Sequence, residues 1–148
     1  MGVIESSASA EIDAPIERCY EAAADIEHID EWQGGVEDVE VLEKDAQGRA
    51  ALIEIATDAK VRVVKAKVAF TYDEPKGLKW TQKKGDLKSV DGAWDFEDLG
   101  GGRTKATYTM KADPGRVLGM LVRGPVEDKL KELLVGERPN ELRKRVGG

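Results

Sequence analysis

Residues 62–72 read RVVKAKVAFTY, and their side chains alternate between the two sides that an extended chain presents. One side carries Val64, Ala66, Val68, Phe70 and Tyr72. The other side carries Lys65 and Lys67, whose charges favour solvent. Because successive side chains of a strand point to opposite faces of its sheet, this pattern predicts a half-buried β-strand with one apolar face.

The same period of two extends to both sides of this strand, from Val36 to Asp113. Turn-forming residues interrupt it at 45–48, 57–58, 75–77, 85–86 and 100–102. Turns at this spacing predict six antiparallel strands joined as a meander. Residues 4–12 alternate in the same way and predict one further strand, which makes seven.

Two short helices are predicted between the first strand and the meander. Pro15 fits the first turn of a helix, where its missing amide costs nothing. Asp25 fits the start of a second helix, which ends near Trp32.

A long helix is predicted to close the chain. Its apolar stripe consists of Val117, Leu118, Leu121, Val122, Val126, Leu130, Leu133 and Leu134. Gly124 and Pro125 are expected to bend or divide this helix, and Gly136 with Pro139 marks another interruption.

The composition limits the chemistry that the protein performs. The chain has 148 residues, with one cysteine, Cys19, and one histidine, His28. These numbers exclude an internal disulfide and a zinc site of the usual kind, so we expect neither a metal nor another cofactor. The length predicts a single domain over residues 1–148.

Charge is distributed unevenly along the chain. The net charge is −6, and residues 1–45 hold 14 acidic side chains but only two basic ones, Arg18 and Lys44. Without a dominant basic surface, we expect no nucleic-acid partner. The amino terminus lacks the basic start and long apolar run of a secretory signal, which predicts a cytoplasmic protein without integral membrane association.

Four segments carry a family resemblance. They are residues 12–20 (IDAPIERCY), Trp32, residues 92–100 (GAWDFEDLG) and residues 103–108 (RTKATY). In this order and spacing the chain resembles the START-like (SRPBCC) superfamily, in its polyketide cyclase/dehydrase and lipid transport branch. The resemblance implies an α+β helix-grip fold, also called Bet v 1-like. In that fold a seven-stranded curved antiparallel sheet wraps around a long C-terminal helix, in the order β-α-α-β6-α.

A cavity is expected between the sheet and the helix, because a curved sheet and one helix meet imperfectly. Family members bind lipids, sterols, polyketides, quinones or plant hormones there, so the resemblance implies an apolar ligand. The candidate ligand-binding residues are Trp32, Val64, Ala66, Val68, Phe70, Trp80, Gln82, Trp94, Phe96, Tyr108, Met110, Leu118, Leu121 and Val122. A core filled by these same side chains is the alternative interpretation.

Polar residues on the predicted inner face are the candidates for catalysis. If the protein is an enzyme, Tyr108, Gln82 and Arg62 are the groups that would stabilise an enolate. His28 lies between acidic residues and is expected to be solvated rather than a general base. The basic residues of the last helix are expected to lie on its exposed face; they are Arg138, Arg143, Lys144 and Arg145.

Three functions fit these features. The first is binding and transport of a small hydrophobic molecule, such as a lipid, a polyketide or a quinone-like compound, by a monomer or weak dimer. The second is a polyketide cyclase or dehydratase that uses no metal or redox cofactor. The third is a protein-interaction module similar to the translation-inhibiting toxins that resemble this family, docking through the basic last helix or the acidic first block. The scarcity of histidine and cysteine favours a container over an enzyme.

Overall fold

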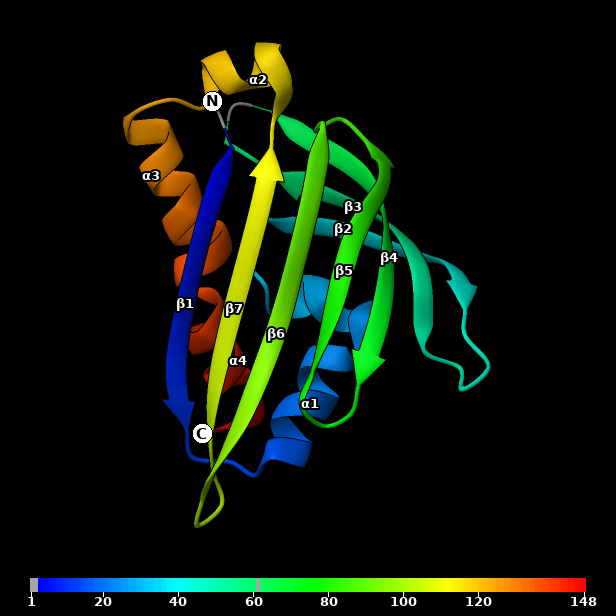
Figure 1. Cartoon of the computed structure of the whole chain (residues 1–148), viewed down its shortest axis with the longest axis vertical. Coiled ribbons are helices and arrows are strands. Elements are labelled where there is room, and N and C mark those ends of the chain that lie inside the picture. Colours follow the sequence, from blue (N-terminus) through cyan, green and yellow to red (C-terminus); the bar gives the residue numbers. More distant parts are fainter. Residues whose placement is uncertain (1–2, 61) are drawn as a thin grey trace.

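The computed structural model describes residues 3–60 and 62–148, which form one curved antiparallel sheet with helices on one side (Figure 1). Its strands are β1 (Ile4–Ile12), β2 (Val36–Lys44), β3 (Ala50–Asp58), β4 (Val63–Asp73), β5 (Gly77–Gly85), β6 (Ser89–Gly100) and β7 (Arg103–Asp113). Across the sheet they follow the order β1-β7-β6-β5-β4-β3-β2. The six-strand meander is therefore confirmed, and β1 pairs with its last strand.

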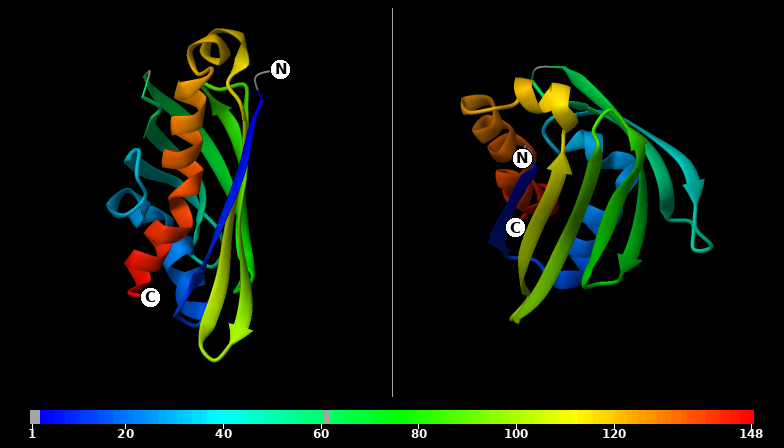
Figure 2. Two further views of the ribbon diagram at one scale, coloured as in Figure 1. Left: turned by 90° about the vertical axis from the view of Figure 1, so that its left-hand side faces the viewer. Right: turned by 45° about the horizontal axis from the view of Figure 1, so that its top comes forward.

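Helices cover the concave face of this sheet. They are α1 (Ile16–Ala24), the 3₁₀-helix η1 (Ile26–Glu31), α2 (Gly115–Leu121), α3 (Pro125–Lys131), the π-helical turn η2 (Glu132–Gly136) and α4 (Arg138–Val146). Figure 2 shows that α3, η2 and α4 form one long rod in front of the sheet. The helix-grip architecture expected from the sequence is confirmed.

The helix α2 departs from the prediction of one long apolar stripe. The chain turns at Gly124, whose φ of +63° suits glycine, and α3 begins at Pro125. Because α2 has a different axis from α3, the stripe does not continue over it. Leu118 and Val122 are buried, whereas Leu121 is 51% exposed. The expectation that Leu121 faces the cavity is wrong for this reason.

The interruption expected at Gly136 and Pro139 is a single π-turn. Proline has no amide hydrogen, so Pro139 cannot donate to the carbonyl of Val135, and its ring would clash with that carbonyl in an α-helix. The amide of Glu137 instead donates to the carbonyl of Glu132, five residues earlier, over 2.9 Å. The wider turn lets the rod continue past the proline without a break.

The π-turn also sets which side chains of the rod face the sheet. Leu130 and Leu142 are both buried, and on an uninterrupted α-helix their spacing would place them about 120° apart around the axis. A π-turn contains one residue more than an α-turn and rotates everything after it by about 100°. The two leucines therefore come to lie on nearly the same side of the rod.

The core is densest where α1 and α4 meet the sheet. Ile12, Cys19 and Leu142 are fully buried there. The hydroxyl of Thr104 on β7 donates to the carbonyl of Ala14 over 2.8 Å, which fixes the start of α1 against the sheet. Among the described residues, no helix is both long enough and apolar enough to cross a membrane.

Two leucines of the C-terminal region provide a matched test of this packing. Leu142→Ala is expected to lower the free energy of unfolding by about 2–5 kcal/mol, because it opens a void in a fully buried site. The same change at the exposed Leu121 is expected to cost less than about 1 kcal/mol. Urea unfolding monitored by tryptophan fluorescence measures both, and equal losses would contradict the assigned positions.

Candidate functional site

A cavity of about 190 Å³ lies between the concave face of the sheet and the helices. A single water molecule needs roughly 10–15 Å³ on the same scale, so the space is large enough for a small organic molecule. The walls come from the strands of the sheet and from the helical segments α1, η1, α2, α3, η2 and α4, and most of the lining residues are apolar. The core is therefore not filled by its own side chains.

Most of the candidate ligand-binding residues line this cavity. They are Val64, Ala66, Val68, Phe70, Trp80, Trp94, Tyr108, Met110, Leu118 and Val122. Parity located those on the strands, because the strands keep one face toward the helices along their length, whereas Leu118 and Val122 come from the predicted helix. Their contact with a ligand stays a prediction.

Three further candidates lie outside the cavity. Trp32 caps the C-terminal end of η1 and packs against the core. Phe96 stacks on Trp94 with ring centroids 5.6 Å apart, beyond the end of the cavity. Gln82 donates from Nε2 to the carbonyl of Leu87 over 2.8 Å and so ties down the β5–β6 turn. Gln82 keeps the inward parity of Trp80, since its partner on β4 is Val68, but the hydrogen bond to Leu87 draws its amide toward the β5–β6 turn.

The candidate Arg62 and two further polar side chains, Tyr72 and His28, are also outside the cavity. Arg62 is exposed and lies 3.8 Å from a carboxylate oxygen of Asp86. The phenol of Tyr72 donates to the carbonyl of Ala50 over 2.6 Å. His28 is exposed, and its Nδ1 lies 2.8 Å from Oδ1 of Asp25, whose hydrogen bond raises the pKa of His28. Of the three groups suggested for enolate stabilisation, only Tyr108 lines the cavity.

An aromatic wall forms the sheet side of the cavity. Trp80 lies 5.7 Å from Phe70 and 5.4 Å from Tyr108 between ring centroids, and Trp94 lies 4.8 Å from Tyr108. Gly92 pairs with Trp80 across β5 and β6, and a Cβ atom at this glycine would overlap the indole ring. The glycine thus lets the indole lie flat against the sheet instead of standing up into the cavity.

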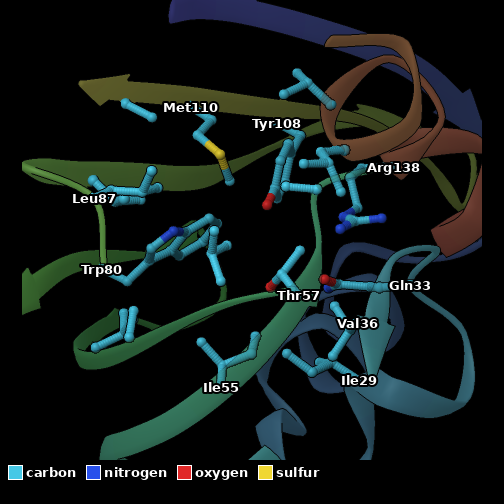
Figure 3. A pocket seen from close by; sticks show the side chains of 18 of the residues that line it. Ile29, Gln33, Val36, Ile55, Thr57, Trp80, Leu87, Tyr108, Met110 and Arg138 are labelled. Carbon is cyan, nitrogen blue, oxygen red and sulfur yellow. The ribbon is translucent and has the colours of Figure 1, made fainter. Parts of the chain in front are cut away.

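Polar groups gather at one end of this apolar space. Figure 3 shows the hydroxyl of Tyr108, the side chain of Thr57, the amide of Gln33 and the guanidinium of Arg138 around the same region. A few converging polar groups in an otherwise apolar cavity are typical of small-molecule sites, where they fix the orientation of the ligand.

Sequence reasoning missed three of these four groups. Thr57 was interpreted as part of a turn, but it pairs with Val64 within the β3–β4 ladder. Gln33 lies in the loop before β2, where no periodicity guides a prediction. Arg138 was expected on the exposed face of the last helix, and this expectation is wrong because the π-turn brings it inward. The neighbouring Gly136 and Pro139 indicated an interruption of the helix, and such an interruption changes which side chains face inward.

Arg138 is 2% exposed and is held by a short network. Its Nη1 donates to the carbonyl of Gly34 over 2.8 Å and to Oε1 of Glu141 over 2.9 Å. Oε2 of Glu141 accepts from the amide of Gly34 over 2.8 Å. Among the described residues, Nε of Arg138 has no hydrogen-bond partner. A buried donor without an acceptor costs about 1–3 kcal/mol, so an oxygen atom that accepts a hydrogen bond from this Nε would remove that cost.

Arg138 also influences the phenol of Tyr108. Its Cζ lies over the Tyr108 ring, 5.9 Å from the centroid. Burial raises the pKa of the Tyr108 phenol, and the positive charge of Arg138 opposes part of that rise. The phenol therefore stays protonated near neutral pH and is available as a hydrogen-bond donor.

Comparison with known proteins places the fold. The family model described as polyketide cyclase/dehydrase and lipid transport matches residues 12–136. A START superfamily protein from Mycobacterium smegmatis is 18% identical, with 97% of each chain covered and a TM-score of 0.83. A protein from Thermus thermophilus is 25% identical, with 96% of each chain covered and a TM-score of 0.81.

An aromatase/cyclase from Streptomyces sp. R1128 has the same fold at lower identity. It is 14% identical, the match covers 98% of this chain and 94% of that chain, and the TM-score is 0.81. No curated protein matches this sequence.

The packing of Trp80 on Gly92 generates one prediction. Gly92→Ala is expected to push the indole away from the sheet, because the added methyl group overlaps the ring, and so to reduce the space in the cavity. Nuclear magnetic resonance of the tryptophan side chains and a crystal structure of the variant would detect the displaced ring. Gly48→Ala is the control: its φ of +81° makes the replacement costly to the backbone, but the exposed turn has open space around it, so Trp80 and the cavity are expected to stay unchanged. An unchanged Trp80 would contradict this role of Gly92.

The tyrosines generate a second prediction. Burial is the largest cause of a raised pKa at all three, Tyr20, Tyr72 and Tyr108, relative to the ordinary value of 10.0. The folded chain therefore binds more protons than the unfolded chain above pH 10. The corresponding stability is fully present below that pH and is lost as the pH rises through the folded-state pKa values.

Ultraviolet absorbance of tyrosinate measures this effect. At pH 10 the folded protein is expected to show little tyrosinate, and unfolding in urea at the same pH is expected to raise the signal. Equal tyrosinate absorbance before and after unfolding would contradict the burial of the phenols.

Proposed function

Because the chain belongs to the polyketide cyclase/dehydrase and lipid transport family, we propose that it binds a small hydrophobic molecule in its internal cavity. In this proposal residues 1–148 act as one START-like domain that shelters the molecule from water and carries it. The observation that supports it most directly is the apolar cavity of about 190 Å³ with polar groups at one end.

The energetics of the cavity favour an organic occupant over an empty space. Protein interiors are normally close-packed, and an unfilled volume forfeits the dispersion contacts of every side chain that lines it. An apolar molecule restores these contacts and gains about 25 cal/mol for each Å² of apolar surface that it buries. The aromatic wall offers flat faces on which planar or ring-containing molecules stack.

Two phenylalanine substitutions on one strand test the proposal. Ala66 lines the cavity on β4, whereas the adjacent Lys67 faces solvent. Ala66→Phe is expected to fill the space and weaken binding of the neutral fluorescent probe N-phenyl-1-naphthylamine by about tenfold or more. Lys67→Phe adds the same group outside and is expected to leave the affinity within about twofold. Equal affinities in the two variants would place the probe elsewhere and reject the cavity as its site.

A second candidate function is that of a cyclase or dehydratase, and one observation favours it. The phenol of Tyr108 lies at the polar end of the cavity next to Arg138, where its hydroxyl would donate a hydrogen bond to an enolate oxygen of a bound polyketone. Gln82 and Arg62, which lie outside the cavity, play no part in this version.

Tyr108→Phe separates the two functions. A catalytic role requires that turnover of a linear polyketone substrate is lost while its affinity is retained, because only the hydroxyl is removed. Unchanged turnover would reject the role of Tyr108, and absence of turnover in the unmodified protein would leave binding as the function.

A further inference from the structure

The positively charged side chains that line the cavity are each paired with a carboxylate. Two cationic side chains line the cavity among the described residues, Arg138 and Lys131. Arg138 is paired with Glu141 at 2.9 Å, and Lys131 is paired with Glu127 at 3.1 Å. Each charge that could attract an anion is therefore already balanced by a carboxylate of the protein.

We infer that the cavity selects molecules with a neutral oxygen-bearing head, such as a ketone or a phenol, over carboxylates, and that Glu141 sets this selectivity. The inference rests on the proposed binding function and specifies the chemical class of the ligand. Glu141 acts through the guanidinium, which contacts Glu141 directly and also lies over the ring of Tyr108.

Glu141 is firmly placed for this role. One of its oxygens accepts from Arg138 Nη1 and the other from the amide of Gly34. Gly34 permits this approach because a Cβ atom there would lie 2.8 Å from Oε2 of Glu141. The carboxylate is thus held by two donors and cannot easily swing away to release Arg138 to another anion.

A carboxylate ligand would meet an unfavourable balance in this environment. It must give up its hydration on entering an apolar cavity, a cost of several kcal/mol for an ion, and only an unpaired positive charge compensates for such a loss. Here the incoming anion would approach a guanidinium that already has its own carboxylate, and Glu141 would repel it.

A neutral oxygen meets a favourable balance. It loses less hydration than an ion, and the polar end offers several groups for it: the Tyr108 phenol, the Thr57 hydroxyl, the Gln33 amide and the unpartnered Nε of Arg138. The rest of such a molecule would lie along the aromatic wall. A ketone or phenol attached to an apolar ring therefore matches both parts of the cavity.

The test uses four compounds that share one ring system: naphthalene, 2-naphthol, 2-acetylnaphthalene and 2-naphthoate. Affinities are measured by isothermal titration calorimetry at about pH 7, where only the naphthoate is ionised. For the unmodified protein we expect 2-naphthol and 2-acetylnaphthalene to bind about tenfold or more tightly than 2-naphthoate. Equal or tighter binding of 2-naphthoate would overturn the inference.

Glu141→Gln tests the assigned residue. It preserves the size of the side chain, removes the balancing charge and is expected to raise the affinity for 2-naphthoate by about tenfold, while that for naphthalene stays within about twofold. Glu137→Gln removes the same charge from an exposed position of the same rod and serves as the control. If both variants raise the affinity for 2-naphthoate equally, long-range charge is responsible and Glu141 is not the determinant.

A double variant keeps the inference testable if Glu141→Gln does not fold. Replacing Arg138 by Met and Glu141 by Leu removes both charges, which buried ion pairs often tolerate. We then expect no gain in affinity for 2-naphthoate, because no unpaired positive charge is left, while 2-naphthol keeps an advantage over naphthalene through Tyr108, Thr57 and Gln33. A gain for 2-naphthoate of the size expected for Glu141→Gln would overturn the role of the pair. Failure of all four compounds to bind the unmodified protein would instead refute the proposed binding function itself.

Discussion

The buried guanidinium of Arg138 connects three parts of the molecule that are distant in sequence. It belongs to α4, it donates to the carbonyl of Gly34 in the loop that leads into β2, and it lies over the ring of Tyr108 on β7. A charge in this position is tolerable only because Glu141 accompanies it, since removing one member of a buried pair typically costs about 3–5 kcal/mol. The loop, the helix and the sheet are therefore positioned around one ion pair, and so is the polar end of the cavity.

The sheet side of the cavity depends on shape rather than charge. The ring of Trp80 packs at a tilt against those of Phe70 and Tyr108, and Gly92 allows the indole to lie against the backbone of the next strand. Side chains held in this way cannot relax into the empty volume, which explains why the space persists in a core that is otherwise closely packed. The cavity is thus bounded by a polar cluster at one end and a stack of rings along one side.

The fold and the sheet side of the cavity could be predicted from the sequence because both follow from the alternation of side chains along the strands. Strand alternation is strict, so Val64, Ala66, Val68 and Met110 could be placed on the inner face without knowledge of the helices. The prediction was weaker where local geometry overrides the period. The side chain of Gln82 is drawn to the carbonyl of Leu87 in the β5–β6 turn, and the separate axis of α2 exposes Leu121. Gln33 lies in a loop, where no period exists to be read.

The π-turn of the last helix makes the polar end of the cavity depend on the number of residues in that helix. A substitution changes one side chain, whereas an added or missing residue in this turn changes which side chain occupies every later position. Arg138 faces inward because of how many residues separate it from Leu130, as well as because of its own chemistry. In relatives with a helix one residue shorter here, the same arginine would point to solvent and a different side chain would close the cavity. Ligand preference in such proteins would diverge through insertions and deletions in the helix, while the sheet that grips it stayed the same.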